Sequence, residues 1–498
     1  MLSGDLAGND ITLADPLDAS GEPTCDDNSH HVIGDGEDSQ DDLVTGAFTV
    51  VIEGLVITGG HAFTEKSGGG PSYRSPREHL GGGLRLWYLS WSAVVKVTVR
   101  HCLFEDNYAK EAGGAVYGLR MDDLTLIDCR MVANGSRGHG GSLFAILGGT
   151  QLTGCQFDRN ASGTTGGGLE FQGEEDVTLT ACTLTNNRAH GSGGGMFISG
   201  NPTKLVDCVL RENRVEWTGG GIELRRAGSL EVVRCRFISN GADSRGGAIC
   251  NHGDQIDLTN CLLCGNTAGD KGGGIWTHLS DLTMINCTAS GNQSAQGGTL
   301  FDETPLDTGT RTRGWVSIRN TIITGEGVQV WNDYGLMSIE HTDLAGGHAG
   351  ISDSSGSVVW GAGNADTDPW FANPGYWDPN GTADDPNDDF FVEGDYHLKS
   401  QAGRRDETSE SWVQDEVTSP CIDAGDPNSP IGHEPFPNGG IINMGAYGGT
   451  AQASKSYFGA PPCGTIIAGD INGDCKVDLA DIIILLDHWL QTGKQANE

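Results

Sequence analysis

The feature that most constrains this chain is a repeat between Cys102 and Asn292, in which one pattern occurs eight times. Each copy has a cysteine, an asparagine five residues later, a glycine pair or triplet, and then an apolar residue. The cysteines lie 26 or 27 residues apart, at Cys102, Cys129, Cys155, Cys182, Cys208, Cys235, Cys261 and Cys287. The asparagines are Asn107, Asn134, Asn160, Asn187, Asn213, Asn240, Asn266 and Asn292. A fixed period of this length indicates stacked units that cannot bury their apolar faces alone, so the chain is predicted to be a solenoid.

The spacing of apolar residues inside each repeat indicates strands. Apolar residues lie five and three positions before each cysteine, as in Val97 and Val99, and a further alternating pair follows the glycines, as in Met196 and Ile198. Alternation with a period of two, interrupted by Gly, Asn and Asp, is typical of short strands. We therefore predict an all-β, right-handed parallel β-helix with three strands per coil and the cysteines stacked inside. The recurring asparagine suits a left-handed turn, and its amide can bond to the asparagines of neighbouring coils.

The chain is predicted to have four consecutive segments. They are a loop-rich N-terminal cap (1–47), the β-helix (48–450), a linker (451–468) and a calcium-binding segment with a small helix (469–498). Within the β-helix, residues 361–416 are acidic, which favours either calcium-stabilised loops or a solvated acidic surface. Residues 421–425 and 443–449 are predicted to form a closing coil and cap.

Charge and hydropathy exclude several classes of partner. The formal net charge of −37 over 498 residues disfavours nucleic acids and anionic membrane surfaces, because both would repel the chain. No apolar run approaches the length of a membrane span. The first residues, Met1–Asp5, show neither the basic nor the apolar region of a signal peptide.

The clearest site chemistry lies between Asp470 and Asp481. Oxygen-bearing side chains occupy positions 1, 3, 5, 9 and 12 of a twelve-residue loop, and position 7 would contribute its backbone carbonyl. This arrangement is typical of an EF-hand loop, whose oxygen ligands suit Ca²⁺. The predicted ligands are Asp470, Asn472, Asp474, Lys476 through its carbonyl, Asp478 and Asp481. The alternative interpretation is a polar turn that leads into a helix.

A short amphipathic helix is predicted after this loop, over residues 479–490, with Gly493 suited to end it. Its predicted apolar side consists of Ile482, Leu485, Leu486, Trp489 and Leu490. The loop and helix together resemble one repeat of a type I dockerin, the module that docks onto cohesin domains in secreted polysaccharide-degrading complexes. The resemblance implies bound Ca²⁺ and a cohesin-like protein partner. A dockerin carries two such repeats and this chain has one, with Cys475 where the family usually has glycine.

The coils carry a second resemblance. An asparagine followed by Gly-Gly-apolar, over roughly residues 50–345, is similar to the repeats of polymorphic outer membrane proteins and of secreted bacterial β-helix proteins. Both resemblances imply an extracellular or cell-surface protein.

The cysteines divide into a repeated set and a remainder. The eight repeated cysteines alternate with core residues, so we expect them to act as small apolar fillers rather than as metal ligands, which must converge on one point. Cys463 and Cys475 flank the start of the predicted calcium loop and would form a disulfide in an oxidising compartment. No role is assigned to Cys25, Cys250, Cys264 or Cys421.

Two rows of residues after the glycines are expected to face outward. Fifteen residues after each of the first seven cysteines lie Tyr117, Phe144, Glu170, Phe197, Glu223, Cys250 and Trp276, and seventeen after lie Leu119, Ile146, Gln172, Ser199, Arg225, His252 and His278. Aromatic residues on a flat sheet can bind sugar rings, which makes Tyr117, Phe144, Phe197, Trp276 and His278 candidate carbohydrate-binding residues. Glu223, Arg225, His252 and His278 form a candidate acid–base patch. The alternative is that inserted loops cover these rows.

Two functions from different classes follow. The first is an extracellular, calcium-binding β-helix that binds glycans or surfaces, in the manner of an adhesin or a structural module. The second is a polysaccharide lyase or glycoside hydrolase that carries a dockerin-like repeat, since β-helices host such enzymes although fold alone does not determine function. A cleft with two carboxylates at catalytic separation would favour the enzyme, and a smooth outer face would favour binding.

Overall fold

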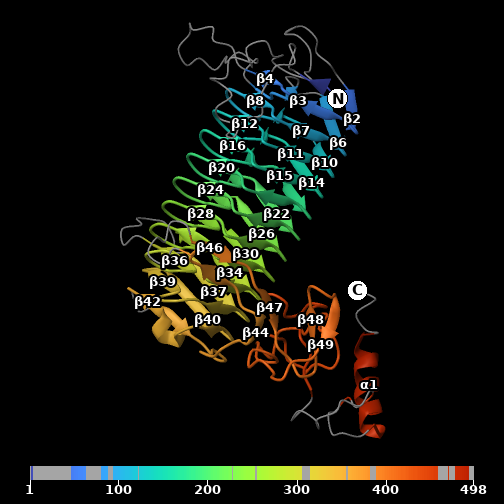
Figure 1. Cartoon of the computed structure of the whole chain (residues 1–498), viewed down its shortest axis with the longest axis vertical. Coiled ribbons are helices and arrows are strands. Elements are labelled where there is room, and N and C mark those ends of the chain that lie inside the picture. The colour runs from blue at the N-terminus through green and yellow to red at the C-terminus, as the bar shows by residue number, and fades with distance from the viewer. Residues whose placement is uncertain are drawn as a thin grey trace.

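The repeat forms a parallel β-helix in which each coil contributes one short strand to each of several sheets (Figure 1). The computed structural model describes residues 2–3, 46–62, 80–87, 93–121, 123–226, 228–252, 255–304, 314–354, 357–381, 389–457, 469, 471 and 477–492. Four sheets run along the helix axis, and we number them I to IV in the order in which one coil visits them.

Sheet I precedes the cysteines and contains twelve strands. They are β2 (Gly46–Glu53), β6 (Ala93–Arg100), β10 (Asp123–Ile127), β14 (Gly149–Thr153), β18 (Val177–Thr180), β22 (Pro202–Val206), β26 (Ser229–Val233), β30 (Gln255–Thr259), β34 (Leu282–Ile285), β37 (Trp315–Arg319), β40 (Leu336–Glu340) and β43 (Val358–Trp360). Sheet II follows the cysteines and also contains twelve. They are β1 (Leu2–Ser3), β3 (Val56–Thr58), β7 (Leu103–Glu105), β11 (Arg130–Val132), β15 (Gln156–Asp158), β19 (Thr183–Thr185), β23 (Val209–Arg211), β27 (Arg236–Ile238), β31 (Leu262–Cys264), β35 (Thr288–Ser290), β38 (Ile322–Thr324) and β41 (Asp343–Leu344).

Sheet III follows the asparagines and contains eight strands of two residues each. They are β4 (His61–Ala62), β8 (Tyr108–Ala109), β12 (Gly135–Ser136), β16 (Ala161–Ser162), β20 (Arg188–Ala189), β24 (Arg214–Val215), β28 (Gly241–Ala242) and β32 (Thr267–Ala268). Sheet IV follows the glycines and contains eleven strands. They are β5 (Leu84–Trp87), β9 (Val116–Leu119), β13 (Leu143–Ile146), β17 (Leu169–Gln172), β21 (Met196–Ser199), β25 (Ile222–Arg225), β29 (Ile249–His252), β33 (Ile275–His278), β36 (Leu300–Glu303), β39 (Val330–Asp333) and β42 (Ile351–Asp353). The sequence predicts three strands per coil, and sheet III is the fourth. A strand of two residues is too short to show an alternating pattern.

The interior of the coils confirms the predicted stack of cysteines. All eight repeated cysteines are buried, at most 2% exposed, and lie in one continuous apolar core with the strand residues of the surrounding sheets. Their thiols donate to backbone carbonyls of the same or the preceding coil, as Cys129 does to Val99 at 3.4 Å. The cysteines therefore fill space inside the helix, as the alternation predicts.

The asparagines form the predicted ladder at the corner between sheets II and III. Each of the first seven side chains bonds to the asparagine of the next coil, as when the Nδ2 of Asn160 donates to the Oδ1 of Asn187 at 3.0 Å. The left-handed residue of this corner is not the asparagine but the residue before it, for example Ala133 (φ 53°) or Glu212 (φ 55°). The prediction of a left-handed asparagine was therefore wrong. The ladder side chain must point inward to reach its neighbours, and the preceding residue makes the turn.

The glycines between sheets III and IV serve two purposes. The first of each group has positive φ, as at Gly219 (φ 72°), which is strained for any residue with a Cβ. The second faces the next coil so closely that a Cβ on Gly220 would lie 2.3 Å from the carbonyl oxygen of Gly247. The pair is thus required by both the turn and the stacking distance.

Beyond the coils, the chain folds back along the helix. Residues 361–416, expected to be loops, contain three antiparallel strand pairs: β44 (Phe371–Asn373) with β47 (Asp395–Leu398), β45 (Tyr376–Asp378) with β46 (Phe390–Val392), and β48 (Arg404–Asp406) with β49 (Ser411–Val413). A 3₁₀ helix, η4 (Gly347–Gly350), precedes them. Residues 421–450 contain no strand and lie against the corner of earlier coils, where Asn260 donates to the carbonyl of Ala446 at 2.9 Å. This segment covers the side of the solenoid, whereas a closing coil was expected.

The C-terminal helix, α1 (Leu479–Thr492), begins at the predicted residue. The side chains of its predicted apolar side are exposed: Ile482 (49%), Leu485 (42%), Leu486 (53%) and Trp489 (71%). The side chain of Leu490, and Gly493, lie outside the described residues. No helix in the described part of the chain is both long and apolar enough to span a membrane.

Candidate functional site

The first of the two predicted outward rows, fifteen residues after each cysteine, lies on sheet IV in the predicted register. Its aromatic side chains, however, are buried. Tyr117, Phe144, Phe197 and Trp276 are only 6%, 6%, 8% and 1% exposed. The first glycine of each turn lies over this row, since a Cβ on Gly193 would lie 3.0 Å from the Cβ of Phe197. Alternation predicts that these side chains leave the core, but it does not reveal that the tight glycine turn folds over them.

Nearby side chains of the same and of neighbouring coils pack on the rings of this row. The guanidinium of Arg245 lies 5.1 Å from the centre of the Trp276 ring, and the half-buried His278 stacks on it at 5.6 Å. Tyr117 and Phe144 stack on each other at 5.6 Å. Tyr117, Phe144, Phe197 and Trp276 therefore do not present the open ring faces that sugar stacking requires.

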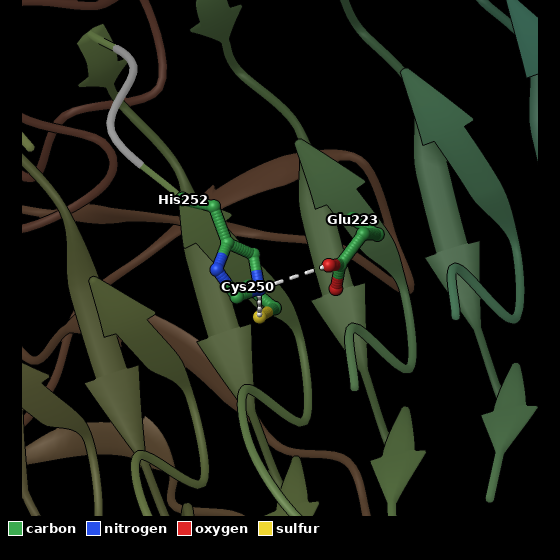
Figure 2. Close-up of side chains that lie close together, drawn as sticks. All are labelled: Glu223, Cys250 and His252. Atoms are coloured by element: carbon green, nitrogen blue, oxygen red, sulfur yellow. Dashed lines mark hydrogen bonds and ion pairs between the residues drawn. The ribbon is translucent and has the colours of Figure 1, made fainter. Parts of the chain in front are cut away.

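Three of the four candidate acid–base residues, Glu223, Arg225 and His252, come together on the adjacent strands β25 and β29, and Figure 2 shows Glu223 and His252. The Nε2 of His252 lies 3.1 Å from the Oε1 of Glu223, to which the Nε of Arg225 also donates at 2.7 Å. Cys250 joins them, with its sulfur 3.5 Å from the Nε2 of His252. His278 lies opposite His252 on the next strand, β33, and both imidazoles contact the ring of Trp276, His252 edge-on and His278 by stacking. We call Glu223, Cys250 and His252 the three-residue cluster.

Burial and charge act in opposite directions on the cluster. Burial raises the pKa of the Glu223 carboxyl, but hydrogen bonding to His252 and the charges of His252 and Arg225 outweigh it and lower that pKa overall. Burial, followed by the charge of Glu223, raises the pKa of the Cys250 thiol well above its ordinary value. The cluster therefore pairs a carboxylate with a protonated thiol at neutral pH.

The cluster does not have the arrangement of a glycosidase. Such an enzyme places two carboxyl groups on either side of the bond to be cleaved. The other carboxylate of the row, Glu170, is fully buried and bonded to Thr165 at 2.7 Å and to Gln172 at 2.6 Å. Glu223 is also fully buried. Neither carboxylate reaches a polymer at the surface.

An open groove of about 480 Å³ lies between the β45–β46 hairpin and the corner of sheets II and III. It is lined by Asn186, Asn187, Arg188, Glu212, Arg214, Ser239, Trp377, Asp389, Phe390 and Phe391. We call it the hairpin groove. Its size lies within the range of ligand pockets, and it combines aromatic rings with charged and amide side chains.

The hairpin is anchored so that the groove keeps its shape. The indole of Trp377 donates to the carbonyl of Gly291 at 2.8 Å and packs edge-on against Phe391. Phe391 lies directly on Gly265, where a Cβ would approach within 2.2 Å of the ring. Glu393, just after β46, pairs with both Arg211 and Arg236 of sheet II.

A smaller pocket of about 210 Å³ lies further along sheet II, against the segment that folds back. In it, the hydroxyl of Tyr447 donates to the Oε1 of Glu407 at 3.0 Å. The two arginines of this pocket are engaged: Arg234 forms two bonds with Asp207, at 2.7 and 2.8 Å, and Arg236 pairs with Glu393. Both guanidinium groups are thus already paired with carboxylates.

The predicted calcium loop is described only at its end. Asp470, Asn472, Asp474 and Lys476 lie outside the described residues, as do Cys463 and Cys475. Asp481 is 1% exposed, and its two carboxylate oxygens accept the backbone N–H groups of Ile471 at 2.6 Å and Asp478 at 2.7 Å. The Ca²⁺ site stays a prediction.

Comparison with known proteins agrees with the fold. Residues 148–344 match the model of the right-handed β-helix region, and residues 375–425 match a family described as disaggregatase related. No curated protein matches the chain. Among solved structures, pectate lyase Pel9A is similar, with a TM-score of 0.37 and 13% identity over 81% of this chain and 96% of that one. The chain is a right-handed parallel β-helix protein, as its repeat predicts.

Proposed function

We propose that the protein is an extracellular β-helix that binds a glycan chain in the hairpin groove. The observation that supports this is the chemistry of the groove. The ring of Phe390 is 48% exposed, and guanidinium, carboxylate and amide groups surround it. An exposed ring offers a stacking face to a sugar, and the polar groups match its hydroxyls.

Comparing two aromatic residues of the same hairpin tests the proposal. Phe390 lines the groove, whereas Tyr376 is 54% exposed on the same hairpin and does not. We expect a glycan array to give at least one ligand for the wild-type protein, and calorimetry to show about tenfold weaker binding for Phe390→Ala, which corresponds to ~1.4 kcal/mol. Tyr376→Ala should bind normally. Equal loss in both variants, or no ligand on the array, would remove the basis of the proposal.

The finer parts of the proposed function are an adhesin-like or structural role, bound Ca²⁺ and export from the cell. The loop spacing and the dockerin resemblance of residues 469–490 support bound Ca²⁺ and export. Immunodetection in culture medium and cell fractions tests the location, and a pull-down with cohesin domains tests the implied partner. A protein confined to the cytoplasm would contradict export.

The alternative is a polysaccharide lyase or glycoside hydrolase. Tyr447 and Glu407 supply acid–base groups in the smaller pocket, but the engaged arginines and the buried Glu170 and Glu223 favour binding over catalysis. Assays for reducing ends and for unsaturated products on a polysaccharide panel separate the two functions. Turnover that Tyr447→Phe abolishes would establish the enzyme instead.

A further inference from the structure

The three-residue cluster has a donor set that none of the proposed activities uses. Glu223 lies on β25, and Cys250 and His252 lie on the neighbouring β29, so the parallel register brings their side chains to one point. One ligand atom from each residue lies within 4.8 Å of the other two. The side chains are thus close enough to share a single ion.

The distances fit a tetrahedral transition metal. Bonds of 2.0–2.3 Å in a tetrahedron separate the ligand atoms by about 3.3–3.8 Å. In the cluster, the Nε2 of His252 lies 3.1 Å from the Oε1 of Glu223 and 3.5 Å from the sulfur of Cys250. Arg225 also bonds to this Oε1, so binding an ion through the other oxygen, Oε2, requires the carboxylate of Glu223 to rotate.

A buried oxygen without a partner marks the place. The Oε2 of Glu223 has no hydrogen-bond partner, although the residue is fully buried. The matching carboxylate of Glu170 is different, because Thr165 and His139 bond to its Oε2 and Gln172 bonds to its Oε1. Buried charged oxygens are normally satisfied, so the unpartnered Oε2 of Glu223 is available to bind an ion.

The neighbouring side chains hold the donors in place. Arg225 donates to the Oε1 of Glu223 and leaves the Oε2 available, as outer-shell partners of metal-bound carboxylates do. Trp276 packs edge-on against His252 with ring centres 4.8 Å apart, which restrains the imidazole. The side chain of His252 is 31% exposed and provides a route for an ion from solvent.

We propose that Glu223, Cys250 and His252 bind one Zn²⁺ ion, with a water molecule as the fourth ligand. Nitrogen, sulfur and oxygen donors together suit zinc, whereas Ca²⁺ and Mg²⁺ take oxygen ligands. On binding, the Cys250 thiol releases its proton to water and its sulfur forms the bond to zinc, so no oxidation or reduction occurs. Three protein ligands and an open position are the arrangement in which zinc also activates water.

Co²⁺ titration of the full-length protein after chelator treatment tests the site, because cobalt bound to a thiolate absorbs in the near ultraviolet. We expect this band to saturate at one equivalent and Zn²⁺ to displace the cobalt. Cys250→Ser should abolish the band. His252→Gln, at a partly exposed position, should weaken Co²⁺ binding at least tenfold even if Cys250→Ser folds poorly.

Two matched cysteine variants control for other thiols. Cys264→Ser removes a buried thiol outside the cluster, and Cys475→Ser removes the thiol of the predicted calcium loop. Both should keep the band and the one-to-one stoichiometry. Absence of the band in the wild-type protein, its survival in a folded Cys250→Ser, or its loss in Cys475→Ser would overturn the proposal.

Discussion

The side-chain amide of Asn213 donates to the Oδ1 of Asn240 at 2.9 Å, one coil further along the solenoid. The same amide donates to the carbonyl of Leu184, and the Oδ1 of Asn213 accepts both the backbone N–H and the amide of Asn187. One fully buried side chain therefore ties together three consecutive coils.

We expect Asn213→Ala to destabilise the protein substantially. The substitution leaves the buried N–H of Asn187 and carbonyl of Leu184 without partners, and each unsatisfied group costs about 1–3 kcal/mol. Chemical denaturation should show a lower free energy of unfolding for Asn213→Ala. The control, Gln151→Ala on the exposed face of β14, should leave the free energy of unfolding nearly unchanged. An unchanged unfolding midpoint for Asn213→Ala would mean that the ladder does not stabilise the coils.

A second prediction concerns the glycines of the turn. A Cβ on Gly220 would lie 2.3 Å from the carbonyl oxygen of Gly247 and 2.6 Å from that of Gly241, and backbone atoms cannot move away cheaply. We expect Gly220→Ala to lower the melting temperature markedly. Gly118→Ala is the control, because a Cβ there would lie 3.5 Å from the side chain of Leu124, an ordinary contact, and Ala145 occupies the equivalent position in the next coil. Equal melting temperatures for the two variants would show that the coils can separate to admit the methyl group.

The repeat allowed the architecture of residues 102–292 to be predicted because each coil obeys the same local rules. The alternation around each cysteine determines which side chains point inward, and the constant spacing determines the register. The left-handed corner residue and the covered row of sheet IV depend on turn geometry, which side-chain alternation does not encode. The spacing of 27 residues also places Glu223 beside Cys250 and Arg225 beside His252, as the predicted rows imply.

The hairpin groove had no comparable signal in the sequence. Its walls come from residues 186–239 and 377–391, which are far apart in the chain and share no repeat. Phe391 packs on Gly265 and Glu393 pairs with Arg211, and contacts of this kind are specific to one pair of surfaces. The role of Cys250 was missed for a related reason, because its chemistry depends on a carboxylate one coil away.

A third prediction follows from Asp302, whose carboxylate points into the core between Thr277 and Asn332. Asp302 is fully buried, and neither of its oxygens has a hydrogen-bond partner. Burial, followed by the charges of Asp333 and Glu303, raises its pKa to about 7. The folded state therefore keeps a proton that the unfolded state loses near pH 4.

The pKa of Asp302 is higher in the folded state than in the unfolded state. The protein is therefore more stable at low pH and loses this stability as the pH rises toward 7. The loss amounts to at most about 4 kcal/mol, at 1.36 kcal/mol for each pH unit. We expect Asp302→Asn to be more stable than the wild type at pH 8, with the difference disappearing by pH 4. Urea denaturation at both pH values measures this, and Asp257→Asn on the outer face of β30 should leave the pH dependence unchanged. A constant difference between Asp302→Asn and the wild type would contradict the raised pKa.

The last prediction concerns calcium. Four carboxylates of Asp470, Asp474, Asp478 and Asp481 lie within twelve residues, so their mutual repulsion opposes ordering of the loop in the absence of a cation. Asp481 already bonds to backbone N–H groups, but each carboxylate oxygen has a second lone pair for an ion. Binding would neutralise the loop and couple Ca²⁺ to its folding.

We expect calorimetry on the full-length protein to show one Ca²⁺ site that Asp470→Ala abolishes. Asp366→Ala, in the acidic region 361–416, should retain it. If Asp366→Ala abolishes the site and Asp470→Ala does not, the ion belongs to the acidic region. If the wild type takes up no calcium at millimolar concentration, the loop is a polar turn.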